Sequence, residues 1–160
     1  MQLLTLVLAL VLQHPTMPAG MSHEEHMKQM QKEAELKRRG AQAMGFDQDA
    51  TVHRFPATAT GGSIEVEVID PKDDASRAAI RAHLKEIAVA FARGDFDKPF
   101  QTHAEVPPGV PEMRRLTAAI AYKYEDTPRG GAVRITTSDE AALKAVHEFL
   151  AYQGREHHPK

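Results

Sequence analysis

Hydrophobic and polar positions along the chain follow two periods, and these predict strands and helices in a repeated order. Two-residue alternation over 51–58, 63–69 and 118–124, and again after Gly131, predicts four strands. Apolar residues three and four apart predict one helix over about 74–93. They predict another that is capped at Ser138 or Asp139 and whose buried stripe is Leu143, Val146, His147 and Leu150. Both halves therefore run strand, strand, helix. We expect an α+β fold, in which a four-stranded, mainly antiparallel sheet carries two helices on one face.

The two halves also share a sequence motif, which indicates a duplicated ββα unit. The copies are Phe55-x-x-Thr58-x-x-Gly61-Gly62-x-Ile64-x-Val66 and Tyr124-x-x-Thr127-x-x-Gly130-Gly131-x-Val133-x-Ile135. Duplicated units pack about a pseudo-twofold axis, so equivalent side chains can converge near it. We expect each Gly-Gly pair to form a hairpin turn, because glycine adopts a positive φ at low steric cost.

Residues 1–20 resemble an export signal, because the apolar run 3–12 is too short to span a bilayer and small residues follow it. Residues 21–43 are expected to be a helical or disordered lead-in, and residues 44–160 the duplicated domain. Export predicts a periplasmic or secreted protein with no stable membrane insertion after signal cleavage. Translation from Met17 or Met21 would instead leave the protein in the cytoplasm.

The composition limits the kinds of binding and metal sites that the chain can form. The 160 residues include 20 basic and 22 acidic side chains, a formal net charge of −2, so no basic field predicts nucleic-acid binding. Cysteine is absent, which excludes disulfides, thiolate metal sites and cysteine nucleophiles. Nine histidines are present. Any metal would therefore be held by His, Met, Asp or Glu.

The histidines are the main candidates for a site. His83 and His147 occupy matching helices of the repeat, His53 is predicted to face the same core, and His103 lies on the proline-bounded link. Neutral imidazoles are suited to copper or zinc. The weaker candidates are His23, His26, Met27 and Met30, which would share one face of a helix, and His157 near the end of the chain. Alternatively, each is a core or surface residue with an ordinary hydrogen-bond partner.

These observations favour an exported metal-binding protein, with copper preferred over zinc or haem, that binds, buffers or delivers the ion. Its metal affinity is expected to fail below about pH 6, where imidazoles protonate. One alternative is a small exported enzyme that uses the same histidines as general acid and base. Another is a structural or interaction domain with core histidines. Either a single chain or a homodimer can complete such a site.

Several strings resemble a family of small, apparently exported bacterial proteins without an assigned mechanism. They are Met44-Gly45-Phe46-Asp47-Gln48, His53-x-Phe55, Pro107-Pro108-Gly109-Val110 and Ala145-Val146-His147-Glu148-Phe149-Leu150. Members are sometimes labelled aspartate carbamoyltransferase. This chain is not expected to be one, because such enzymes have a much longer two-domain α/β fold and a Ser-Thr-Arg-Thr carbamoyl-phosphate loop that is absent here.

Overall fold

The computed structural model describes residues 22–99 and 104–157. The predicted signal segment and His103 lie outside this range. Helix α1, His23–Met44, occupies most of the segment expected to be a helical or disordered lead-in. It starts in the expected capping box, where Glu25 N donates to Ser22 Oγ at 3.2 Å and Ser22 N to Glu25 Oε2 at 2.9 Å. The chain divides into two compact units between Glu33 and Ala34, within α1.

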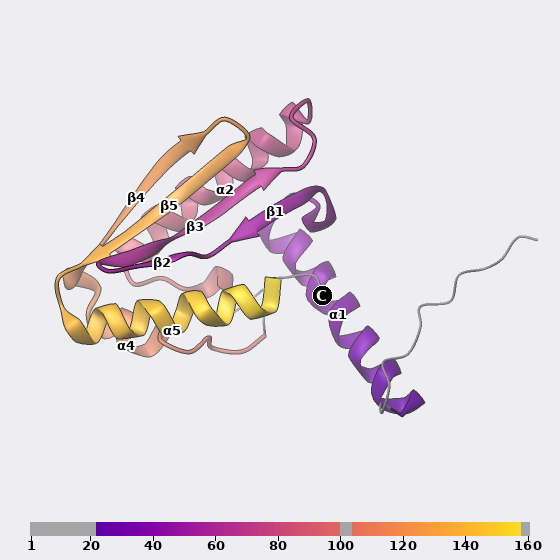
Figure 1. Cartoon of the computed structure of the whole chain (residues 1–160), viewed down its shortest axis with the longest axis horizontal. Coiled ribbons are helices and arrows are strands. Elements are labelled where there is room, and N and C mark those ends of the chain that lie inside the picture. Colours follow the sequence, from indigo (N-terminus) through magenta and orange to yellow (C-terminus); the bar gives the residue numbers. More distant parts are fainter. Residues whose placement is uncertain (1–21, 100–103, 158–160) are drawn as a thin grey trace, which may run out of the picture. The chain divides into compact units, whose positions relative to one another are not determined.

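The second unit is built on an antiparallel sheet (Figure 1). Its strands are β1 (Thr51–Arg54), β2 (Ala57–Thr58), β3 (Gly61–Val68), β4 (Ile120–Thr127) and β5 (Gly130–Thr137). They run in the order β1-β3-β5-β4, and β2 also pairs with β3. The α+β class is thus confirmed, but the expected count of four strands is wrong. The strand predicted over 51–58 divides around Pro56, which has no N–H to donate to a ladder.

The expectation that the Gly-Gly pairs form the turns is also wrong. The turns lie one step earlier, at residues 59–60 and 128–129, and Gly61 and Gly130 are the first residues of β3 and β5. Glycine is needed there because the strands approach closely. A Cβ on Gly61 would lie 1.9 Å from Ile135 O, and one on Gly130 would lie 2.0 Å from Val66 O.

The two long helices of the second unit begin at side-chain caps. Helix α2, Asp74–Ala92, starts after Asp73, whose carboxylate accepts from Ser76 N at 2.9 Å. Helix α5, Glu140–His157, starts after Asp139, whose carboxylate accepts from Ala142 N at 2.9 Å. The short helix α4, Val110–Arg115, packs against α5.

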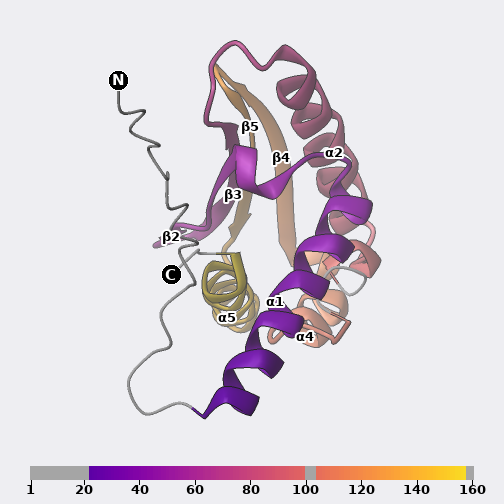
Figure 2. The same cartoon turned by 90° about the vertical axis from the view of Figure 1, so that its right-hand side faces the viewer.

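Each long helix mainly covers strands from the other half of the chain. Helix α2 packs chiefly on β4 and β5, whereas α5 packs chiefly on β3 (Figures 1 and 2). The halves meet where Ile64 of β3 lies opposite Val133 of β5, and these two residues are equivalent in the sequence repeat. This register agrees with a duplicated unit, although duplication itself stays a prediction.

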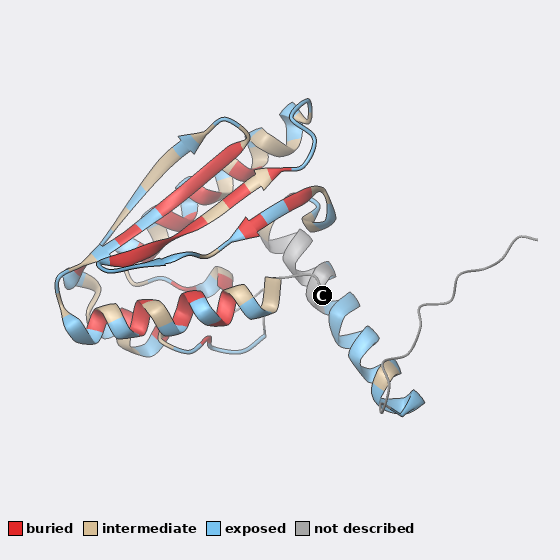
Figure 3. Cartoon of the chain, in the orientation of Figure 1, coloured by how far each residue is buried: buried red, intermediate tan, exposed pale blue. Residues whose placement is uncertain are grey.

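One hydrophobic core lies between the sheet and the helices, and Figure 3 shows its buried residues along β3, β5 and the inner faces of α2 and α5. The opposite face of the sheet carries a ladder of charges. Arg54 Nη2 lies 2.8 Å from Glu67 Oε2, and Arg134 Nη1 lies 3.1 Å from Glu65 Oε1. Such pairs add little stability individually, but they keep the uncovered face hydrophilic. In the described part of the chain, we find no helix with the length and apolar character needed to cross a membrane.

Candidate functional site

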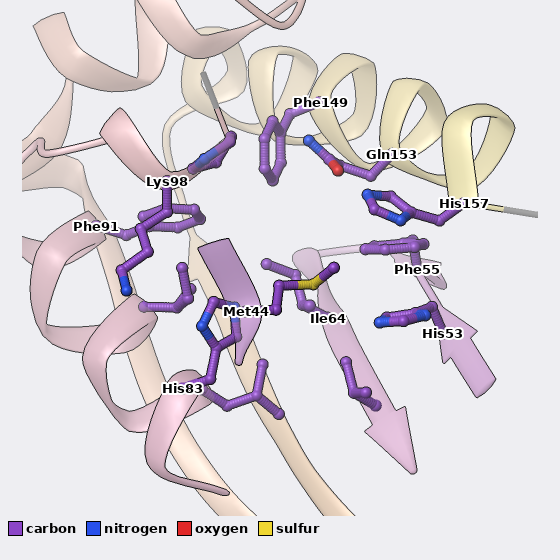
Figure 4. A pocket seen from close by; sticks show the side chains of 14 residues that line it. Met44, His53, Phe55, Ile64, His83, Phe91, Lys98, Phe149, Gln153 and His157 are labelled. Carbon is purple, nitrogen blue, oxygen red and sulfur yellow. The ribbon is translucent and has the colours of Figure 1, made fainter. Parts of the chain in front are cut away.

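A mostly apolar pocket lies at the end of the core where β1, β3, α2, α5 and the last residue of α1 come together (Figure 4). Its volume is about 60 Å³, enough for an ion or a few water molecules. Most of its lining is aliphatic or aromatic. Six lining residues instead carry a nitrogen, oxygen or sulfur atom in the side chain: Met44, His53, His83, Lys98, Gln153 and His157.

His53 is the most deeply buried histidine of the pocket. Strand alternation directs it inward, and it pairs in register with Val66 on β3. Only 8% of its surface is exposed. Its Nε2 atom is buried and has no hydrogen-bond partner among the described residues. Burial lowers the His53 pKa to about 4, so the imidazole is neutral near pH 7. A buried nitrogen without a hydrogen-bond partner lowers the stability of the fold, and a bound ion or water molecule would satisfy it.

His83 lies in the pocket on α2, as its place in the apolar stripe predicted. Its ring contacts Phe46 edge-on, with centroids 5.8 Å apart. Burial, and then the charge of Lys98, lower the His83 pKa to about 4. The imidazoles of His53 and His83 line the same pocket. The Lys98 ammonium lies 3.0 Å from Glu86 Oε2.

His157, a weaker candidate in the sequence, proves to be part of the pocket. Its ring centroid is 5.3 Å from that of His53 and 5.6 Å from that of Phe55. Helix α5 continues to this residue. The four-residue spacing places half-buried His157 on the same face as buried Phe149 and Gln153. Continuing the helical stripe through Gln153 would have revealed this position from sequence.

The spacing of His53 and His157 fits two ligands of one metal ion. With a metal–nitrogen distance of about 2.0 Å, each imidazole centroid lies about 3.2 Å from the ion, and two rings at the tetrahedral angle are about 5.2 Å apart. The observed separation is 5.3 Å. The thioether of Met44 lines the same pocket. The pocket therefore contains two neighbouring imidazoles and a thioether as candidate metal donors.

His147 does not line the pocket, so the expected convergence of His83 and His147 does not occur. Its Nε2 lies 3.0 Å from Thr58 O and 3.1 Å from Gly61 O. Because carbonyl oxygens only accept, Nε2 carries the hydrogen and donates to them, which ties α5 to the β2–β3 turn. On α5, Val146 and Leu150 are buried, but Phe149 rather than His147 completes the buried face.

The remaining candidates lie elsewhere. His103 is outside the described residues. His23, His26, Met27 and Met30 lie on α1 with the predicted helical spacing, and Met27 and Met30 are 41% and 43% exposed. Over residues 22–99 and 104–157, no group of three or more His, Asp or Glu side chains is already placed to hold a metal ion. Among the described residues, the neighbouring rings of His53 and His157 are therefore what most resembles the predicted histidine metal site.

Comparison with known proteins adds no identification: the chain matches no protein-family model, and neither the curated proteins nor the solved structures contain a significant match.

Proposed function

We propose that the protein binds copper in this pocket, with His53 and His157 as its first ligands. The observation that carries the proposal is the buried His53 Nε2, which has no partner among the described residues. The centroid of the neighbouring His157 ring lies at a separation close to that of two imidazoles bound to one ion. His83, which also lines the pocket, is a further candidate donor.

The protonation state of the pocket supports ligand binding better than acid–base catalysis. A general base is most effective when its pKa lies near the working pH, whereas burial holds the pKa of His53 and His83 at about 4. A metal, by contrast, binds the neutral imidazole. Protons therefore compete for the imidazoles of His53 and His83 only well below the value of about pH 6 expected for ordinary histidines.

The pocket also distinguishes among the candidate cofactors. Haem is far larger than a cavity of about 60 Å³. Zinc commonly takes four nitrogen, sulfur or carboxylate ligands, and no Asp or Glu is among the described residues that line the pocket. Copper accepts a set of imidazoles with a thioether. With export as predicted from the first twenty residues, the proposed role is copper binding, buffering or delivery outside the cytoplasm.

The proposal is tested by copper titration of the full chain and of two double variants. Replacing His53 and His157 with glutamine should weaken copper binding by at least about 100-fold, since changing even a supporting residue of a metal site costs 10–100-fold. Replacing His23 and His26 with glutamine removes the same number of imidazoles from α1 and should leave the tight site intact. Circular dichroism checks that each variant is folded.

Two results would contradict the pocket assignment. One is a wild-type protein that takes up no copper. The other is tight binding that survives in the folded His53/His157 variant and disappears in the His23/His26 variant, which would move the site to α1.

A further inference from the structure

Met44 brings to the pocket a donor that differs from the imidazoles around it. It is the last residue of α1, is partly buried and packs against the hydrophobic core. It lines the cavity together with His53, His83 and His157. Figure 4 shows its side chain in the pocket, with His83 on one side of the view and His53 and His157 on the other. Among the described lining residues, its thioether is the only sulfur.

The charge of the lining favours an ion of low charge. None of the described lining residues is a carboxylate, and the Lys98 ammonium is paired with Glu86 at 3.0 Å. The cost of moving an ion from water into an apolar site rises with the square of its charge, so a monovalent ion pays about a quarter of the cost of a divalent one. Neutral donors in an apolar pocket thus favour Cu(I) over Cu(II) or Zn(II).

We propose that Met44 completes a Cu(I) site with His53 and His157 and makes the site select Cu(I) over Zn(II). This inference rests on the proposed function and names the oxidation state of the ion. Imidazole binds both metals, whereas a thioether is a soft ligand that favours Cu(I). Met44 is therefore the donor that distinguishes Cu(I) from Zn(II). Its loss should lower the affinity for Cu(I) and leave the affinity for Zn(II) unchanged.

The experiment compares the full chain with Met44→Leu and Met30→Leu variants under argon. Leucine nearly conserves the volume of methionine, so the Met44→Leu protein should remain folded. Competition with bicinchoninate measures Cu(I) affinity, and competition with a chromophoric zinc chelator measures Zn(II) affinity. Met44→Leu should lower Cu(I) affinity by about tenfold or more, with Zn(II) affinity unchanged. Met30→Leu removes an exposed thioether of α1 and should change neither. X-ray absorption at the copper edge should show a sulfur neighbour that is missing in Met44→Leu.

The outcomes distinguish failure of this inference from failure of the proposed function. If the wild-type chain binds neither ion, both proposals are contradicted. If it binds copper but Met44→Leu changes neither affinity, or weakens Cu(I) and Zn(II) equally, Met44 does not set the selectivity and this inference alone is overturned. A copper-bound sulfur that disappears in Met30→Leu instead would place the thioether donor on α1 and also overturn it.

Discussion

Lowering the pH from 7 to 4 is expected to destabilise the metal-free protein by several kcal/mol, because two histidines are buried in their neutral form. The pKa of both His53 and His83 falls from 6.5 to about 4 on folding. Between these values the unfolded chain binds protons that the folded chain does not, so stability is complete above pH 6.5 and is lost as the pH falls towards 4. The full loss amounts to about 3 kcal/mol per histidine.

The measurement is urea unfolding of metal-free protein at a series of pH values. A His53→Leu variant should lose about half of the pH dependence in this window, because one of the two linked groups is gone. The matched change His23→Leu, on exposed α1, should keep all of it. A wild-type stability that stays constant between pH 6.5 and 4.5 would contradict the burial of these imidazoles.

Gly130→Ala is expected to be among the most damaging single substitutions in the domain. A Cβ at this position would lie 2.0 Å from Val66 O, and the obstacle is the backbone of the neighbouring strand rather than a flexible side chain. Strands β3 and β5 would have to separate at the end of their ladder where β5 begins. We expect a loss of at least about 3 kcal/mol, the upper end for overpacked sites.

Gly45→Ala is the matched control for this prediction. Gly45 has a φ of +78°, but a Cβ there meets no atom within 4 Å. Its replacement should cost only the backbone strain of a left-handed alanine, about 1–2 kcal/mol. Chemical denaturation of both variants gives the comparison. Equal losses would show that close strand approach is not what requires glycine at position 130.

Local periodicity predicted much of this architecture. Strand alternation placed His53 and Phe55 on the inner face and Val52 and Arg54 on the outer face, as observed. Where the prediction failed, the deciding interactions were between distant segments. The glycine pairs looked like turn residues, but contacts with Ile135 and Val66 on neighbouring strands explain them.

For the site as well, local sequence patterns predicted some residues, whereas others depended on tertiary packing. His53 and His83 could be assigned to the core from their own strand and helix. The repeat also suggested His147, but the rotation of α5 about its axis is set by packing of Phe149, and this turns His147 towards the β2–β3 turn. His157 was underestimated because its proximity to His53 depends on how far α5 extends and where it lies.

The central claim is that His53 and His157 bind one copper ion, and imidazole ¹⁵N NMR of the metal-free full chain titrated with Cu(I) tests it most directly. We expect the ring nitrogens of His53 and His157 to shift together and saturate at one equivalent of copper, while those of His147, held by the carbonyls of Thr58 and Gly61, stay unchanged. Shifts confined to His23 and His26, with His53 unaffected at saturation, would contradict the account.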